Sequence, residues 1–511
     1  MKVARTFILG SAAGLIVMSG AQAADLPVKA KAIEYVKVCS AYGVGFWYIP
    51  GTDTCIKLGG YLRIDTTFNG GAQGQPAWNG DIAQQNRYRD YYSARSRMAL
   101  TVDTRTASEY GTVRTFLQAD MQFTTLGNTT FNPNNLNTTL GNNAQLLDTP
   151  GGGYVAVESV FIQFAGFTFG KSVSAYSTPW NAFPGNISSF LIGGHDTTTG
   201  VNNIQYTAQF GDGVSASIGL DDPTVFGRTS VYNIGAGASV ISNLGISNSY
   251  YAGVHSPDVV GNIRIDQAWG LFQLSGALHE VNGSYNFANA NATPNAFSEI
   301  SGHPETKWGG AVMAALQIKN LPTGAGDDIK IDATWAKGDT KNVISTSSTS
   351  PNFAMFGGSG VAYQSVGFGA TTDGIYVPGG AIQLTEAYGV RGAFNHNWDP
   401  KWSSSLFGSY SAIRYNGTAK ASYCTSYGAG VVGLGLTYSC NPDFNVSQLG
   451  VITRWVPVKN LTFSAEAMWL HLDQSFAGTA TFAPTAPKPA TVYEFRDQNA
   501  FSLQLRAQRN F

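Results

Sequence analysis

Long and short connections alternate along this chain, and that alternation limits the fold more than any single motif does. Alternating apolar and polar residues mark sixteen candidate strands, at 59–69, 92–104, 112–123, 154–164, 167–173, 201–210, 213–221, 259–267, 271–281, 308–319, 328–337, 385–396, 402–414, 446–456, 461–472 and 499–511. The odd-numbered connections between them hold 22 to 47 residues, whereas the even-numbered ones hold 2 to 8. Up-and-down barrels of outer membranes have an even number of strands, short periplasmic turns and long outer loops, whereas a secreted β-sandwich has no reason to place its long loops at alternate connections. The pattern therefore predicts an all-β fold, a 16-stranded antiparallel transmembrane β-barrel.

The first 23 residues predict export. Lys2 and Arg5 form a basic start, residues 7–18 an apolar stretch, and residues 21–23 a small-residue cleavage site. An uncleaved helical anchor needs about 20 apolar residues, and this stretch has about 12. We therefore expect a signal peptide at 1–23, a mature chain from about Ala24, an N-terminal segment at 24–58 and the barrel at 59–511.

Composition disfavours other classes of protein. Charged residues make up only 12% of the chain, and the formal net charge is −1. Such a balance creates no global field for polyanions, so we expect no nucleic-acid partner. Beyond the signal peptide, the sequence has no apolar run of 18 residues, which excludes a helical membrane protein.

The two faces of the candidate strands differ in chemistry. Successive strand side chains point to opposite faces, so the apolar Leu62, Ile64 and Phe68 share one face of the first strand. The opposite, lumen-facing set on the first three strands is charged: Arg63, Asp65, Arg95, Arg97, Asp103, Arg114 and Asp120. A barrel of 16 to 18 strands is wide enough for an aqueous channel. The sequence therefore predicts lipid outside the barrel and water within it.

Two further strand features bear on the surroundings of the barrel. Five tryptophans lie near strand ends, where membrane interfaces favour amphipathic rings: Trp308, Trp335, Trp402, Trp455 and Trp469. The strand at 154–164 is apolar on both faces, which suggests protein on one side and a folded-in loop on the other. The residues concerned are Val155, Val157, Phe161, Ile162 and Phe164. Residues 231–240 form a seventeenth strand candidate, which we assign to a loop.

The four cysteines form two local pairs, Cys39 with Cys55 and Cys424 with Cys440. Export makes disulfides permissible, and locality favours the sequential pairing among the three connectivities that four cysteines allow. Zinc binding is the competing interpretation, but neither pair has a C-x-x-C motif or a histidine at ligand spacing. We expect two disulfides, no metal and no cofactor.

Three stretches carry a family resemblance. Residues 39–63, residues 455–463 and the ending at 506–511 resemble sequences of the alphaproteobacterial, Rhizobiales-type porins. The resemblance implies a homotrimeric, passive pore whose third long loop, residues 174–200, folds inward. It also implies outer-membrane lipid, lipopolysaccharide and the outer-membrane assembly machinery as partners, with Phe511 as the residue which that machinery reads.

Within such a pore, Arg63, Arg95, Arg97 and Arg114 are expected to form a basic wall at the constriction. The wall would face the third loop, whose only acid is Asp196. Asp65, Asp103 and Asp120 lie on the same strand faces and would temper any preference for anions. The alternative is that the arginines only pair with these aspartates along the wall.

The predicted function is a general diffusion porin for small hydrophilic solutes and ions, not an enzyme. The six histidines are scattered, and the sequence contains neither H-E-x-x-H nor G-x-S-x-G. Two alternatives remain open: a channel on the same barrel that prefers a solute such as a sugar, and a surface adhesin or receptor acting through long loops such as 338–384.

Overall fold

The computed structural model describes residues 37–511 except 88, 125–153, 197, 225–226, 236–239, 290, 348–349, 432–436 and 485–486. The predicted signal peptide at 1–23 and its cleavage site lie outside the described residues. The second long connection, at 125–153, lies outside them as well.

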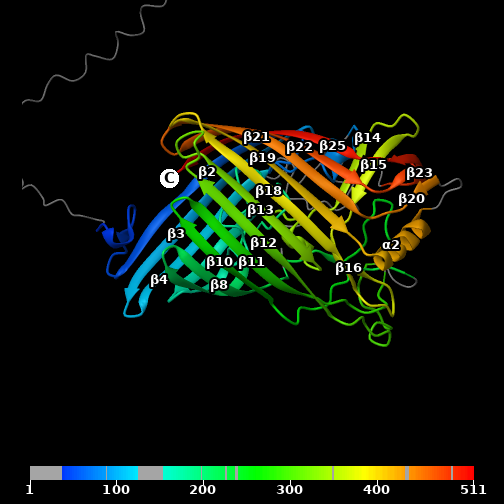
Figure 1. Ribbon diagram of the computed structural model, residues 1–511, viewed down its shortest axis with the longest axis horizontal. Coiled ribbons are helices and arrows are strands. Elements are labelled where there is room, and N and C mark those ends of the chain that lie inside the picture. Colours follow the sequence, from blue (N-terminus) through cyan, green and yellow to red (C-terminus); the bar gives the residue numbers. More distant parts are fainter. Residues whose placement is uncertain are drawn as a thin grey trace, which may run out of the picture.

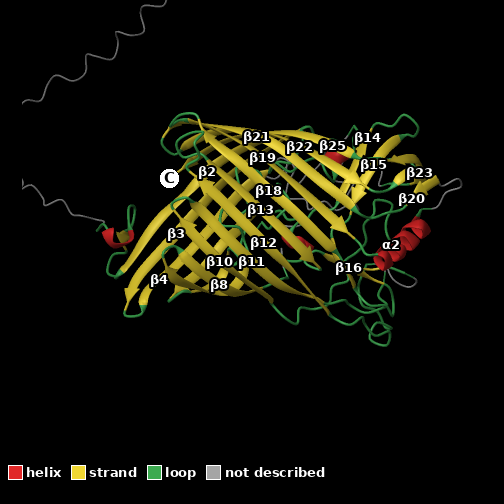
Figure 2. Ribbon diagram, in the orientation of Figure 1, coloured by secondary structure: helices red, strands yellow, loops and turns green. Residues whose placement is uncertain are grey.

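A closed antiparallel barrel dominates the structure (Figures 1 and 2). Its sixteen strands are β2 (Thr54–Phe68), β3 (Tyr92–Ser108), β4 (Gly111–Thr124), β5 (Tyr154–Phe164), β6 (Phe167–Ser172), β7 (Val201–Gly211), β8 (Val214–Asp221), β10 (Asp258–Gln267), β11 (Gly270–Val281), β12 (Lys307–Lys319), β13 (Asp328–Lys337), β18 (Glu386–Asn397), β19 (Trp402–Arg414), β21 (Phe444–Val458), β22 (Leu461–Gln474) and β25 (Gln498–Asn510). Each strand pairs with the next one along the barrel, and β25 pairs with β2 to close it. All sixteen predicted strands are confirmed.

The two ends of the barrel differ as the connection lengths predicted. At one end lie short turns such as residues 109–110 between β3 and β4, and at the other end lie the long loops, which we number 1 to 8 in chain order (Figure 1). Loop 1 spans 69–91, loop 3 spans 173–200, loop 6 spans 338–385 and loop 7 spans 415–443. Both described chain ends lie at the short-turn end.

The N-terminal segment forms a small unit at the short-turn end. Strand β1 (Trp47–Tyr48) pairs with the first residues of β2, which therefore begins before the expected position 59. The disulfide Cys39–Cys55 joins the unit to β2, and Phe46 packs with both cysteines in a small buried cluster. The expected second disulfide, Cys424–Cys440, is present in loop 7.

The outer face of the barrel is apolar. Leu62, Ile64 and Phe68 are 40–49% exposed and face outward, as do the tryptophans 308, 335, 402 and 455. Trp402 stacks on Trp455 near the short turns, with ring centroids 5.8 Å apart. These rings lie where the two interfaces of a membrane favour them.

The expectation that β5 is apolar on both faces is wrong, because the strand contains a β-bulge. Gln118 of β4 pairs with Ser159 but Ala119 pairs with Val157, so Glu158 is an extra residue. A bulge reverses the alternation of side chains along a strand, and Val155, Val157 and Ile162 therefore all face outward at 45–66% exposure. Of the five apolar residues named for this strand, Phe161 is the one that faces the lumen, opposite Phe116. The strand is thus not apolar on both faces.

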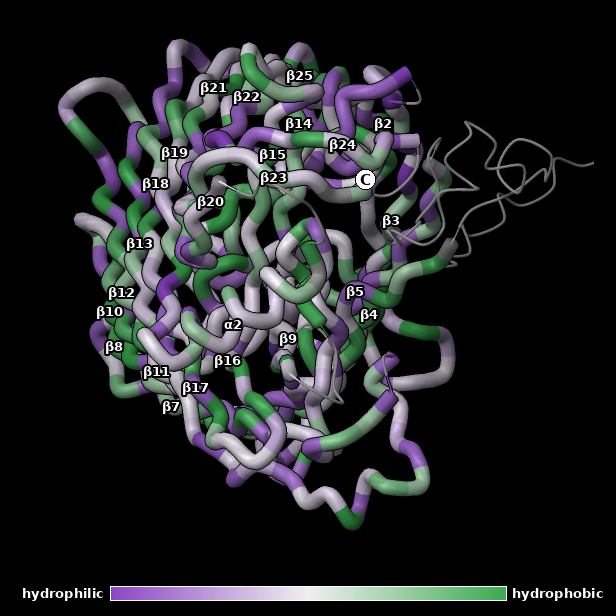
Figure 3. Tube along the Cα trace, turned by 90° about the vertical axis from the view of Figure 1, so that its right-hand side faces the viewer, coloured by the Kyte–Doolittle hydropathy of each residue, from purple (hydrophilic) through white to green (hydrophobic). Residues whose placement is uncertain are grey.

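The long loops fold into and over their end of the barrel. Loops 6, 7 and 8 contribute β14 (Phe353–Gly357), β15 (Gln364–Gly369), β20 (Thr437–Ser439), β23 (Ala477–Phe482) and β24 (Thr491–Phe495) to one small sheet. Strand β9 (Ser230–Asn233), from the seventeenth candidate segment, joins β16 (Thr372–Tyr376) and β17 (Gln383–Leu384) in another. Figure 3 shows these elements across the barrel opening.

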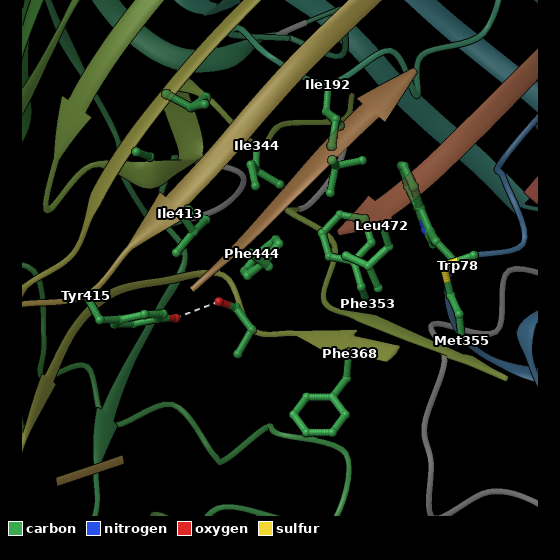
Figure 4. Close-up of a cluster of buried hydrophobic side chains, with 14 of the residues drawn as sticks. Trp78, Ile192, Ile344, Phe353, Met355, Phe368, Ile413, Tyr415, Phe444 and Leu472 are labelled. Atoms are coloured by element: carbon green, nitrogen blue, oxygen red, sulfur yellow. Dashed lines mark hydrogen bonds between the residues drawn. The ribbon is translucent and has the colours of Figure 1, made fainter. Parts of the chain in front are cut away.

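The loops have a hydrophobic core of their own. Figure 4 shows Trp78 of loop 1, Ile192 of loop 3 and Phe353 of loop 6 gathered beside Phe444 of β21. The ring of Trp78 meets that of Phe353 edge to face, with centroids 5.5 Å apart. Such burial, at about 25 cal/mol per Å² of apolar surface, stabilises the folded loops.

Loop 7 contains the helix α2 (Gly417–Gly430), which the all-β prediction did not include. Asn416 caps it by accepting a hydrogen bond from the backbone N–H of Ala419. In the described part of the chain, no helix is both long and apolar enough to span a membrane.

Candidate functional site

Loop 3 folds inward and follows the inner wall from β10 to β25. Barrel side chains bind its backbone in sequence: Asn262 donates to the carbonyl of Ala175 at 2.5 Å, Gln273 to that of Ser177 at 2.7 Å, and Asn395 to that of Pro184 at 3.0 Å. Arg454, Arg506 and Glu466 continue this series at Gly185 and Ile187. We call the strands that bind loop 3 the covered wall: β10, β11, β13, β18, β21, β22 and β25.

Arg391 of β18 is the most deeply buried of these anchors. Its side chain is 0% exposed and its Nε donates to both carboxylate oxygens of Asp332 at 3.0 Å. Its two remaining nitrogens donate to the carbonyls of Leu191 and His195 in loop 3, at 3.3 and 2.6 Å. A fully buried charge is tolerated only when it is paired and hydrogen-bonded, and here both partners are supplied.

Loop 6 also enters the barrel and packs on loop 3. Residues 339–346, which include the short helix η3 (Thr340–Asn342), are all buried. The backbone N–H of Gly193 donates to the carbonyl of Val343 at 2.8 Å, and that of Asp196 donates to the hydroxyl of Ser345 at 3.2 Å. The lumen is therefore narrowed by two loops, of which the sequence predicted one.

Asp196 lies at this junction of loops 3 and 6. It is 3% exposed, and the charges nearest to it include those of Arg391 and Lys341. Burial raises the pKa of Asp196 and lowers that of Lys341 to about 8. Its neighbour His195 is also buried, which lowers the pKa of the imidazole to about 3. The predicted acid of loop 3 is thus embedded among loop residues.

The four predicted arginines lie on β2, β3 and β4, which with β5 we call the open wall. Arg63 is directly opposite Arg97, whereas Arg114 is opposite Arg105, nearer the short turns. Arg95 donates from Nε to Asp65 at 2.8 Å and Arg114 donates from Nε and Nη2 to Asp103 at 3.1 Å. Arg97 pairs with Asp120 and, at 3.2 Å, with Glu158. Arg63 donates to Gln508 at 2.8 Å. Three of the four arginines therefore pair with the three wall aspartates. That the arginines form a basic wall at the constriction stays a prediction.

Exposure divides the open wall into two levels. Near the long loops, Arg95 is 5% exposed and Asp65 is 0% exposed, and loop 1 packs there, with Ser93 donating to the carbonyl of Gly70 at 2.8 Å. Nearer the short turns, Arg114 is 28% exposed and Arg63 is partly exposed. The lower half of the wall therefore faces solvent.

Several side chains that shape the site were not predicted: Glu158, Lys341, Arg391, Arg454, Glu466 and Arg506. Arg391, Glu466 and Arg506 lie at alternating polar positions of predicted strands, so their inward direction was recognisable. Their partners in loop 3 are distant in sequence, and strand periodicity carries no information about such contacts.

A polar cavity of about 310 Å³ lies on the short-turn side of loop 3. It is bounded by Asn186 of loop 3, Lys330 of β13, Asn395 of β18 and Arg454 of β21. Amide, ammonium and guanidinium groups of this kind suit water and hydrophilic solutes better than apolar ones.

An apolar outer face, a charged inner face and inward-folded loops define the class: the protein is an outer-membrane β-barrel channel. The chain belongs to the porin subfamily, whose family profile matches residues 25–504. The resemblance seen in the sequence is confirmed. As a member of this family the protein is a general diffusion channel of the outer membrane and not an enzyme.

Individual relatives agree with this assignment. The chain is 30% identical to Porin Omp2b of Brucella neotomae over 345 residues, which cover 63% of this chain and 84% of that protein. It is 32% identical to Porin Omp2b of Brucella abortus over 268 residues, or 52% of this chain and 63% of that protein. Among solved structures, the outer membrane channel DcaP of Acinetobacter baumannii superposes with a TM-score of 0.57 at 14% identity, covering 91% of this chain and 99% of that one. The last similarity concerns the fold alone.

Proposed function

We propose that solutes pass between the open wall and the pair of inward loops, with Arg63, Arg97 and Arg114 along the path. The observation that supports this route is the placement of the loop 3 anchors, which lie on β10 to β25 and leave β2 to β5 facing the lumen. Guanidinium and carboxylate groups line the path. The solutes that pass its narrowest level are therefore small and hydrophilic.

The charges of the route favour a weak preference for anions. Near Arg95 and Arg97, the open wall and the adjoining β25 hold four guanidiniums, Arg63, Arg95, Arg97 and Arg506, against three carboxylates, Asp65, Asp120 and Glu158. Nearer the short turns, the cations Lys57, Arg105 and Arg114 lie around the single carboxylate of Asp103. On the covered wall, Arg391 is matched by Asp332 and Arg454 lies near Glu466. Charges that line a pore set its ion preference, so the excess on the open wall is the one that ions meet.

Reversal potentials in planar bilayers test this route. Replacing Arg63 and Arg114 with Ser should shift the reversal potential toward cations under a salt gradient, most strongly at low salt where screening is weak. The matched control is the lipid-facing Leu100→Ala, which should leave the potential unchanged. Equal potentials for the double variant and the parent would place the pore elsewhere.

We also propose that the channel works as a homotrimer. The outward face of β5 is apolar, with Val155 66% exposed, and this face can be buried against a neighbouring copy. Mass measurement of the detergent-solubilised complex tests the assembly, and a monomer would contradict it.

Three further proposals concern how the chain reaches its place. The signal peptide at 1–23 would be cleaved, so that N-terminal sequencing of the outer-membrane form begins at Ala24.

Phe511, 58% exposed beside Gly60 of β2, would be recognised by the outer-membrane assembly machinery. Phe511→Ser should therefore lower the amount of assembled barrel. Lipopolysaccharide would surround the long-loop end, which co-purification from intact outer membranes can test.

A further inference from the structure

An aromatic pair lines the lower half of the open wall, where a water-filled pore would be expected to present polar groups. Phe116 of β4 and Phe161 of β5 are direct cross-strand partners on the lumen side. Their rings stack with centroids 5.3 Å apart and an interplanar angle of 24°. Both side chains are partly exposed.

A guanidinium group covers this aromatic pair. The Cζ atom of Arg114 lies 5.2 Å from the ring centroid of Phe116 and 5.5 Å from that of Phe161. Arg114 is fixed in place because it also donates to Asp103 twice at 3.1 Å and to Gln163 at 2.8 Å. A rigid charge beside a flat apolar surface is therefore built into the wall.

The surroundings of the pair are strongly positive. Asp103 is shared by Arg105 and Arg114, which are 30% and 28% exposed. Lys57, directly opposite Asp103 on β2, is exposed. Three cations, Lys57, Arg105 and Arg114, thus lie around one carboxylate at this level.

We propose that Phe116, Phe161, Arg105 and Arg114 form a weak binding site for solutes that combine an aromatic ring with a carboxylate. The ring of the solute stacks on the phenylalanines, and its carboxylate meets the guanidiniums of Arg105 and Arg114. The inference rests on the proposed route along the open wall and adds to it a class of preferred solute.

The cost of the arrangement supports a role in binding. Full burial of a phenylalanine side chain is favourable, and two rings left partly in water forgo some of that gain. Exposed apolar patches rimmed by polar groups mark ligand-binding grooves. Aromatic stacking and cation–π contacts are each weak, which suits a channel because a solute must leave as readily as it enters.

The permeability ratio of benzoate to acetate tests the proposal, because the two anions share a charge and differ in the ring. The ratio is measured from bi-ionic reversal potentials in planar bilayers. For each variant, the benzoate and acetate permeabilities are both expressed relative to the chloride permeability of that variant. In the parent we expect the ratio of benzoate to acetate permeability to exceed the ratio that free diffusion of the two anions predicts. We also expect benzoate to add concentration-dependent current noise. Phe116→Leu with Phe161→Leu should lower the ratio about two- to tenfold, which is the range expected for losing one aromatic contact.

The matched control is a second stacked pair on the opposite face of the barrel wall. Phe167 and Phe169 of β6 stack with centroids 5.8 Å apart and are 42% and 43% exposed on the outer face. Phe167→Leu with Phe169→Leu should leave the ratio as in the parent. A ratio in the parent that follows free diffusion, or one that the lumen-facing variant leaves unchanged, would overturn the binding site. Absence of chloride conductance in the parent would instead contradict the channel function itself.

Discussion

The open wall and the covered wall contain the same kinds of charged side chain, but these side chains have different roles in the two walls. On the covered wall, charges such as Arg391 and Asp332 are fully buried, and the guanidinium of Arg391 donates its other hydrogen bonds to the backbone of loop 3. On the open wall, the arginines bind acids and amides of their own or neighbouring strands, and toward the short turns they remain partly exposed. The comparison teaches that a lumen-facing charge can serve either the shape of the pore or its selectivity. The partner of the side chain decides which.

Removal of Arg391 should have the largest effect. Arg391→Ala leaves Asp332 buried without its partner, and breaking a buried pair in this way costs about 3–5 kcal/mol. Loop 3 should come away from β18, and single-channel conductance should rise and become noisy. Amide hydrogen exchange of residues 190–196 gives the independent measure. Unchanged conductance and exchange would show that Arg391 does not hold the loop.

Removal of the loop 7 disulfide should have a smaller and local effect. A disulfide that closes about 15 residues contributes about 3 kcal/mol, mostly through the unfolded state, and Cys424–Cys440 lies in loop 7, outside the barrel strands. Cys424→Ser with Cys440→Ser should speed proteolysis within loop 7 and leave conductance nearly unchanged. Cys39→Ser with Cys55→Ser is the control at the other end of the barrel and should leave loop 7 intact.

Acidification should loosen the covered side before the open wall. His195 has its pKa lowered to about 3 by burial, with the charges of Lys341 and Arg391 acting in the same direction. At this histidine the folded loop binds fewer protons than the unfolded loop, so its contribution to loop stability falls by up to about 1.4 kcal/mol for each pH unit from about pH 6.5 down to about pH 3. The raised pKa of the neighbouring Asp196 acts in the opposite direction. The protection of loop 3 amides, taken relative to the intrinsic exchange rate at each pH, should fall between pH 6 and pH 4. His195→Asn should reduce this pH dependence, and an equal dependence in the variant would exclude His195 as its cause.

The smallest effect on stability is expected at Arg114 of the open wall. Its pair with Asp103 is partly exposed, and such pairs contribute about 0–1 kcal/mol. Arg114→Ala should leave the thermal unfolding of the barrel almost unchanged while it alters ion preference. A loss of stability comparable to that of Arg391→Ala would remove the distinction between the two walls.

The strands were predictable because their alternation is local. Each face of a barrel strand meets a different medium, so apolar and polar residues alternate with period two. The rule gave the wrong faces for β5 because Glu158 is an extra residue that shifts the alternation. Helix α2 had a signal that went unused: Ala419, Tyr423 and Tyr427 recur every fourth residue behind the capping Asn416, and all three are buried. Helical period, rather than strand period, was the pattern to test in loop 7.

The constriction was predictable only in part. The lumen-facing direction of Arg63, Arg95, Arg97 and Arg114 follows from strand period. The structure places the first three at neighbouring positions of β2 and β3 and Arg114 apart from them, near the short turns. The entry of loop 6 depends on contacts such as Gly193 with Val343, between segments about 150 residues apart. No periodic pattern in either segment specifies such a contact. Asp196 as the acid facing the arginines stays a prediction, since the structure places it beside Ser345 and Thr198.

The route of the pore can be measured directly by thiol accessibility, because all four native cysteines are in disulfides. Thr101→Cys places a thiol on the lumen side of β3 at a partly exposed position, and Ser275→Cys places one on β11 at a position 2% exposed beside loop 3. An anionic methanethiosulfonate reagent added during single-channel recording should reduce the current of Thr101→Cys within the recording and leave Ser275→Cys unmodified. Current reduction at Ser275→Cys with none at Thr101→Cys would place the pore along the covered wall and contradict the account.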